Sequence, residues 1–280
     1  MSASLEELVD IAEDLVKFSA SAMEINRIAR DDDAGMPELI VAVEADPNFS
    51  MNILRIANSP VYLRGEPTVS VAQAITRIGR LELGQMAFAA ACMEGMEALE
   101  GELLQLQSLW RDGMLVGGIA RELCALVPSA REFSYAAGML HSIGTMVLNS
   151  QLPERMAEAM RLSLDYDVPL YKAEKHLIGF TNATLGGALA RRWNFPEPLA
   201  MAIEYQHCPE KAPAHKETVA VIAIASTILD QSLQSNEFAD ARDELEDMLD
   251  KLDIRAQFEE ANLDASELFN KVCETSAAAA

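Results

Sequence analysis

Cysteine, histidine, aromatic side chains and positive charge are all scarce in this chain of 280 residues. The four cysteines stand far apart and form no CxxC pair, which argues against a disulfide framework or a thiolate zinc site. The 22 lysines and arginines face 44 aspartates and glutamates, which gives a net charge of −22. A chain this acidic is poorly suited to nucleic acid or to an anionic membrane surface. We therefore expect no nucleic acid partner.

Several signatures of catalysis and membrane insertion are also missing. The sequence has no Gly-rich strand-to-helix turn, hence no P-loop and no dinucleotide fingerprint, and it has no G-x-S-x-G elbow. No run reaches the roughly 18 apolar residues that a membrane span requires. The acidic, amphipathic start of the chain is unlike a secretory signal. We expect a cytoplasmic protein with no membrane insertion.

Helical periodicity, in contrast, is present along almost the whole chain. Half of the residues are hydrophobic, and they recur with the spacing of amphipathic helices. Asp46 and Pro47 predict a break between two short helices, because the aspartate can cap the second helix and the proline fits its first turn. Ser70 predicts a further cap and Gly79 a further break. No segment has a strand pattern, so the predicted fold is all-α with short connections.

The last part of the chain differs in composition. Residues 236–280 contain thirteen acidic residues and four basic ones, while their apolar residues keep helical spacing. This pattern predicts an acidic helical C-terminal extension that packs on the body or on a partner, with a frayed alanine-rich tail. A solvated acidic face with no specific ligand is the alternative.

Six motifs in a fixed order carry a family resemblance. They lie in "EADPNFSMNILRIANSPVY", "VSVAQAITRIG", "SLWRDGMLVGGIARELC", "YAAGMLHSIGTMVLNSQLPE" and, for the last two, "AEKHLIGFTNATLGGALARRWNFPEPLAMAIEYQHCPE". Together they resemble the HDOD family, the HD-related output domain of bacterial signalling proteins. The family-signature positions are Asp46, Pro47, Asn58, Ser59, Trp110, Trp193 and Pro196.

The resemblance implies a helical HDOD fold related to the HD-domain phosphohydrolases. We assign this domain to residues 8–235, with an N-terminal helical half at 8–100 and an HD-like half at 101–235. The apolar stretch 135–148, which contains His141, is predicted to be one helix of the core.

The resemblance also implies where a metal site would lie. Catalytic relatives hold their metal with a histidine, an adjacent His-Asp pair and a later aspartate, and binuclear members add two histidines. The corresponding positions form a candidate vestigial pocket, namely Asp112, His141, Ser142, Asn182, Gln206 and Ser226. Only His141 keeps its original type, whereas a catalytic site needs at least three protein ligands and an open position for water. We expect no catalytic metal, no cofactor and no catalytic residue.

The residues alone favour the same conclusion. Of the four histidines, His141 and His207 lie on apolar helices, where each is better explained as a core residue than as a ligand. We therefore expect a non-enzymatic regulatory protein that contacts a signalling partner in trans, because the chain is too short to carry a receiver or cyclic-dinucleotide domain as well. An alternative is a small-molecule or nucleotide sensor that uses the former metal pocket, with Arg191 and Arg192 supplying positive charge. A residual metal-dependent phosphohydrolase is the third hypothesis.

Overall fold

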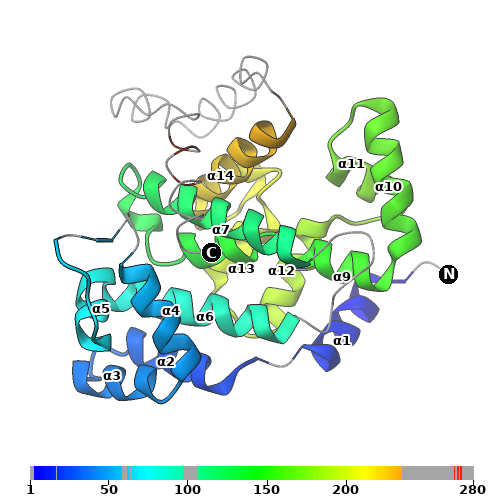
Figure 1. Cartoon of the computed structure of the whole chain (residues 1–280). Coiled ribbons are helices and arrows are strands. Elements are labelled where there is room, and N and C mark those ends of the chain that lie inside the picture. The colour runs from blue at the N-terminus through cyan, green and yellow to red at the C-terminus, as the bar shows by residue number, and fades with distance from the viewer. Residues whose placement is uncertain are drawn as a thin grey trace. The chain divides into compact units, whose positions relative to one another are not determined.

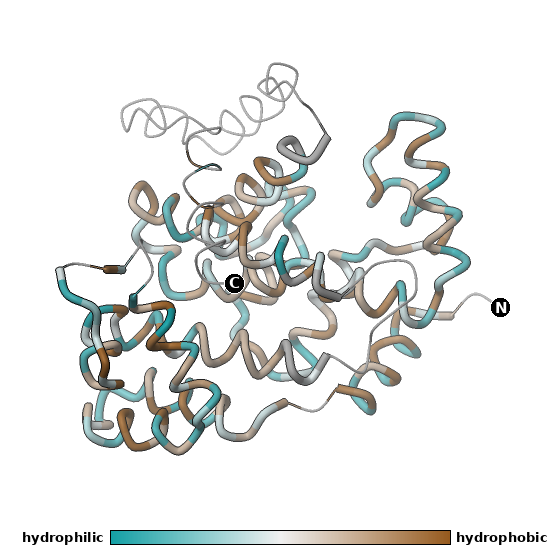
Figure 2. The backbone as a smooth tube through the Cα atoms, viewed as in Figure 1, coloured by the Kyte–Doolittle hydropathy of each residue, from teal (hydrophilic) through white to brown (hydrophobic). Residues whose placement is uncertain are grey.

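The computed structural model of the chain describes residues 3–16, 18–58, 62–63, 65–96, 106–234, 268, 270 and 272. These residues form helices joined by short connections, without any strand, as the all-α prediction requires (Figure 1). Hydrophobic and hydrophilic residues are interspersed along the helices (Figure 2). None of the described helices combines the length and the apolar character needed to cross a membrane. Ser59, the side chain of Trp110 and nearly all of the predicted C-terminal extension lie outside the described residues.

The chain divides into two compact units. Unit 1 comprises Met1–Lys17 and Met96–Phe269, and unit 2 comprises Phe18–Gly95 and Asn270–Ala280. The division near residue 96 lies close to the predicted boundary at residue 100. The difference is α1 (Leu5–Leu15), which we predicted in the N-terminal half and which belongs to unit 1.

Long-range ion pairs hold α1 in unit 1. The guanidinium of Arg192 contacts three carboxylates of α1, with Asp10 at 2.6 Å and Glu13 at 2.7 Å, and it also contacts Glu6. The apolar face of α1 is buried, and the helix packs against α9 (Ile143–Gln151) and α12 (Asn182–Arg192). No periodicity within α1 could have indicated this partner.

Unit 2 confirms the predicted helix ends. The carboxylate of Asp46 accepts a hydrogen bond from the amide of Phe49 at 3.0 Å, and Pro47 opens the helix. Ser70 caps the next helix, and Gly79 separates the last two with a φ of 99°, which favours glycine. The helices are α2 (Ala20–Arg30), α3 (Met36–Glu44), α4 (Pro47–Ala57), α5 (Val71–Ile78) and α6 (Arg80–Met96).

The signature residue Asn58 links the end of α4 to the approach to α5. Its side-chain amide donates to the carbonyl of Thr68 at 2.8 Å and accepts from the amide of Thr68 at 2.7 Å. Arg77 of α5 donates to the carbonyls of Ala57 at 3.1 Å and Glu66 at 2.9 Å. The asparagine of the motif is therefore a structural residue that satisfies backbone groups.

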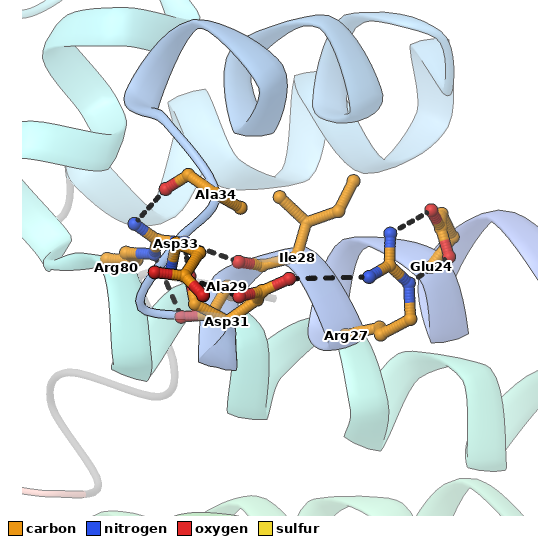
Figure 3. A network of polar contacts seen from close by, with 8 residues as sticks. All are labelled: Glu24, Arg27, Ile28, Ala29, Asp31, Asp33, Ala34 and Arg80. Carbon is orange, nitrogen blue, oxygen red and sulfur yellow. Dashed lines mark hydrogen bonds and ion pairs between the residues drawn. The ribbon is translucent and has the colours of Figure 1, made fainter.

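Arg80, the residue after Gly79, ties α6 to the end of α2. The last carbonyls of a helix lack partners within the helix, and a cation there is favourable. The guanidinium of Arg80 supplies those partners. It donates to the carbonyls of Ile28, Ala29, Asp31 and Ala34 (Figure 3).

Unit 1 is built around two helices that pack closely, α7 (Leu106–Leu123) and α8 (Ser134–Leu140). Gly117 of α7 faces Gly138 of α8, where a Cβ atom would lie only 2.5 Å from the backbone of Gly117. In α14 (Lys216–Gln234), nearly all residues from 218 to 229 are buried, as the apolar sequence predicted. The helices after α1 are α7 (Leu106–Leu123), α8 (Ser134–Leu140), α9, α10 (Pro153–Tyr166), α11 (Leu170–Leu177), α12, α13 (Glu197–Glu204) and α14 (Lys216–Gln234).

The prediction of one continuous helix over 135–148 is wrong. The stretch forms α8 and α9, with His141 and Ser142 between them. The ring Nδ1 of His141 hydrogen-bonds the carbonyl of Gly138 at 2.7 Å, a contact that competes with the regular helical ladder. The histidine and the serine thus occupy a corner between two short helices.

Candidate functional site

A group of polar side chains lies inside unit 1, at the corner between α8 and α9 and on the elements that pack there. Thr145, Glu174 and Gln206 are buried, and the other members are partly buried. We refer to this group as the polar cluster, which consists of His141, Thr145, Glu174, Asn182, Gln206 and His207.

Asn182, the first residue of α12, makes the most contacts in the polar cluster. Its side-chain nitrogen donates to the hydroxyl of Thr145 at 2.9 Å, and its backbone amide donates to Glu174 Oε2 at 2.7 Å. Its Oδ1 lies 3.2 Å from Nε2 of His207. Because an amide oxygen only accepts, this geometry requires that His207 Nε2 carries the proton. That nitrogen is therefore engaged as a donor and has no lone pair for a metal.

His141 is held from two sides. Its Nδ1 points at the carbonyl of Gly138, so Nδ1 carries the proton and Nε2 keeps the lone pair. Its own carbonyl accepts a hydrogen bond from Gln206 Nε2 at 2.8 Å. Burial lowers the pKa of His141, while the Gly138 carbonyl and the negative charge of Asp112 oppose that shift. The neutral ring is the favoured form.

Burial also keeps the other titratable members of the cluster neutral. It raises the pKa of Glu174 from 4.5 to about 7, against the hydrogen bond from the Asn182 amide. It lowers the pKa of His207 from 6.5 to about 4, and the proximity of His141 acts in the same direction. Between about pH 4 and pH 7 the glutamate is therefore mostly protonated and the histidine mostly uncharged.

Some buried polar atoms of this region lack a hydrogen-bond partner. They include Oε1 of Glu174, Oε1 of Gln206 and the hydroxyl of Ser142. Both polar atoms of the Asn149 side chain are in the same condition. Folded proteins leave few such atoms, because each costs the free energy of its lost hydration. The packing around the corner between α8 and α9 therefore leaves several buried polar atoms without hydrogen bonds.

The residues present do not fit a catalytic metal of the HD type. Among the described residues, no group of three or more His, Cys, Asp and Glu side chains has a geometry that could hold a metal ion. At the cluster, the nitrogen with a free lone pair is Nε2 of His141, and the carboxylate whose charge acts on that ring is Asp112, which also pairs with Arg111 at 3.4 Å. Two such groups are fewer than the three protein ligands that a catalytic site needs.

The structure brings together most of the positions of the predicted pocket. His141, Asn182 and Gln206 lie in the cluster, Asp112 acts on His141 through its charge, and Ser142 is buried beside His141. The hydroxyl of Ser226 donates within its own helix, to the carbonyl of Ala223 at 3.1 Å.

The predicted pocket did not include two central members of the cluster. His207, which the sequence analysis interpreted as a core residue, presents its side chain to Asn182. Glu174 stands eight residues before Asn182 in the segment "AEKHLIGFTN", a spacing that the prediction did not use. Gly179, between the two, has a φ of 101° and turns the chain there.

The positive charge expected from Arg191 and Arg192 is already neutralised. Arg191 pairs with Glu197 at 3.0 Å and with Glu204 at 2.6 Å. Arg192 pairs with the carboxylates of α1 described above. The suggestion that these arginines would attract a phosphorylated ligand therefore loses its support.

Solved structures from several bacteria share this fold. An HDOD domain protein with unknown function from Geobacter sulfurreducens superimposes with a TM-score of 0.71 at 21% identity, over 96% of this chain and 98% of that chain. A protein provisionally named a phosphohydrolase, from Shewanella amazonensis SB2B, gives 0.75 at 22% identity over 97% and 95% of the two chains. One provisionally named a signal transduction protein, from Marinobacter aquaeolei VT8, gives 0.74 at 21% identity over 100% and 61%.

Sequence relationships agree with the structural ones. An uncharacterized protein of Treponema pallidum (strain Nichols) is 24% identical over 230 residues, which are 81% of this chain but 44% of that protein. The chain thus spans less than half the length of this relative. The HDOD domain matches residues 15–209, which is well over half of the chain. The chain belongs to the HDOD family.

Proposed function

We propose that this chain is a non-enzymatic regulatory protein of bacterial signal transduction, which acts in the cytoplasm by contact with a separate protein. The observation that carries the proposal is that positions of the predicted pocket are used in hydrogen bonds within the fold. Asn182 hydrogen-bonds the side chains of Thr145 and His207, and Gln206 donates to the carbonyl of His141. The likeness to the Marinobacter protein, named for signal transduction, is consistent with this role.

The chemistry of the cluster supports the absence of phosphohydrolase activity. Metal-assisted hydrolysis needs a cation that lowers the pKa of a bound water, and that cation needs at least three protein ligands. Here Nε2 of His207 is a donor, and Glu174 is mostly protonated below about pH 7. A neutral set of donors provides little of the charge that holds a divalent ion.

Two measurements on the full chain test this proposal. Phosphodiesterase assays with added manganese should give no turnover above buffer for the wild type or for His141→Ala. Hydrolysis that His141→Ala abolishes would show that the cluster is catalytic. Affinity capture from the native cell should yield a protein that, once purified, binds the chain directly without nucleotide. We still predict that the acidic residues 236–280 form a contact surface for the partner.

The sensor hypothesis rests on a different observation, the buried polar atoms without partners. Oε1 of Gln206 could accept a hydrogen bond from a small ligand, and Oε1 of Glu174 could donate one while the carboxyl is neutral, because Oε2 already accepts from the Asn182 amide. Thermal-shift screening with nucleotides separates the two hypotheses. A saturable stabilisation that Gln206→Met removes would favour a sensor, and no shift with any nucleotide would favour the interaction role.

A further inference from the structure

α10 and α11 form a helical hairpin that stands away from the other helices of unit 1 (Figure 1). Its base packs on α9 and α12, whereas no residue between Ala159 and Ala173 is buried. The hairpin tip, defined as residues 162–169, carries two strongly exposed apolar side chains. Leu164 is 83% exposed and Tyr166 is 74% exposed. Both belong to the last turn of α10 and, two positions apart, project from different sides of the helix. Exposed apolar groups on a protruding element often mark an interaction site.

The tip has a fixed turn. The hydroxyl of Ser163 donates to the carbonyl of Val168 at 2.6 Å, and the amide of Val168 donates back to the carbonyl of Ser163 at 3.1 Å. Asp167 has a φ of 49°, a left-handed conformation that aspartate adopts more readily than most residues. Leu164 and Tyr166, in the last turn of α10, are therefore followed by a turn with its own internal hydrogen bonds.

The helix that follows the tip, α11, is fixed as well. The ring of Tyr171 stacks on the ring of His207, with centroids 4.5 Å apart and an interplanar angle of 7°. Glu174, on the same helix, is buried and accepts the amide hydrogen of Asn182. A hairpin with an anchored second helix and an unburied tip presents a preorganised surface, and preorganisation reduces the entropy lost on binding.

The charge of the tip indicates the partner it suits. Its sequence, "LSLDYDVP", alternates apolar residues with Asp165 and Asp167 and contains no lysine or arginine. An anionic membrane would repel these aspartates, and a second copy of this chain, with its net charge of −22, would do the same. A basic protein surface would attract them.

We propose that the hairpin tip is a docking surface for a separate protein that offers an apolar pocket rimmed by lysine and arginine side chains. The tip inserts into the pocket, Leu164 and Tyr166 contact different walls of it, and Asp165 and Asp167 pair with its rim. This inference rests on the proposed function and names the surface that performs it.

The test begins with identification of the partner. Full-length chain carrying a photo-crosslinking residue at position 166 is expressed in the native cell, with the same residue at position 51, on α4, as the control. Met51 is also strongly exposed and belongs to unit 2. The protein joined at position 166 is identified and purified. Its affinity for the intact chain is then measured by titration calorimetry.

Two pairs of double variants decide the outcome. Leu164→Ser with Tyr166→Ser should weaken binding about tenfold or more, as the loss of buried anchors does. Val41→Ser with Met51→Ser, which removes exposed apolar groups from unit 2, should leave the affinity unchanged. Asp165→Asn with Asp167→Asn should weaken binding at low salt more than at high salt. Asp32→Asn with Asp33→Asn removes the same charge from unit 2 and should have no such effect.

The contrary results separate this inference from the proposed function. Unchanged affinity of the tip variants for a purified partner that does bind the chain would overturn the docking surface alone. Tip-dependent self-association in sedimentation would show that the tip binds a second copy of the chain and not a separate protein. Tip-dependent binding to phosphatidylglycerol vesicles would show that it binds a membrane. Either result would overturn the proposed partner. If no purified protein binds the wild-type chain, both the proposed function and this surface are wrong.

Discussion

The two units use buried and partly buried polar groups in opposite ways. In unit 2, the donors of Asn58, Arg77 and Arg80 all reach backbone carbonyls at helix ends and connections. In unit 1, the polar cluster retains polar atoms without partners, among them Oε1 of Glu174 and Oε1 of Gln206. A satisfied network stabilises a fold, whereas a half-satisfied one costs stability. The motif residues of unit 2 therefore satisfy backbone groups, whereas the motif segments of unit 1 leave polar atoms without partners.

The largest predicted effect comes from the network of unit 2. Arg80→Met removes the donors to four carbonyls, and we expect a loss of about 4 kcal/mol in the free energy of unfolding. Urea denaturation measures this loss. Arg27→Met is the control, because Arg27 lies in the same region with a side chain that is 56% exposed, and it should remain close to wild type (Figure 3). Equal losses for both arginines would contradict the role assigned to Arg80.

In unit 1, the close approach of backbones should matter more than the polar side chains. A Cβ atom at Gly144 would collide with the carbonyl of Asn182, where α9 meets α12. Gly144→Ala should therefore destabilise the chain by about 3 kcal/mol, the cost of overpacking a close contact. Gly35→Ala, where the new Cβ atom would meet the Pro37 ring at 3.3 Å, should have a much smaller effect in the same denaturation series.

Glu174 should make the free energy of unfolding depend on pH. Its pKa is 4.5 in an unfolded chain and about 7 in the folded one, so the folded chain binds the proton more tightly. The contribution of Glu174 to the free energy of unfolding falls as pH rises from about 4.5 to about 7, and it stays low above that range. Glu174→Gln removes this dependence while it keeps an acceptor for the Asn182 amide.

The difference between this variant and the wild type isolates the effect of Glu174. Glu174→Gln should match the wild type near pH 4.5 and exceed it by about 2 to 3 kcal/mol at pH 8, according to the size of the pKa shift. Denaturation across this pH range provides the comparison. A variant that is less stable than the wild type at pH 8 would show that the ionised carboxylate stabilises the fold.

The smallest predicted effect concerns two matched amides. Gln206→Met loses hydrogen bonds from one nitrogen to the carbonyls of His141 and Ile203 but also removes an acceptor without a partner, so the free energy of unfolding should change by less than about 1 kcal/mol. Asn58→Leu loses a reciprocal pair with Thr68 and should cost about 2 kcal/mol. If the two substitutions cost the same, the contrast between the units does not hold.

Local chemistry explains which parts of the fold the sequence could predict. The cap at Asp46, the proline after it and the break at Gly79 depend on residues within one turn, and all three are confirmed. The corner at His141 could not be predicted from periodicity, because a side-chain contact with Gly138 decides it. The place of α1 was equally hidden, since its partner Arg192 is far along the chain.

The candidate site shows the same limit. Motif positions pointed to His141 and Asn182, whereas His207 was interpreted as a core residue and its contact with Asn182 was not foreseen. Glu174 went unnoticed because its contact with the Asn182 backbone has no periodic signature, although its spacing from Asn182 was visible. Burial and hydrogen-bond geometry, which only the fold supplies, decide the protonation states of both residues.

Elemental analysis of the full chain tests most directly the claim that the polar cluster is not a metal site. The protein is purified without chelator from cells supplied with manganese, iron and zinc, alongside His141→Ala. We predict that metal content is far below one equivalent per chain and equal in the two proteins. Stoichiometric metal in the wild type that is lost in His141→Ala would contradict this account.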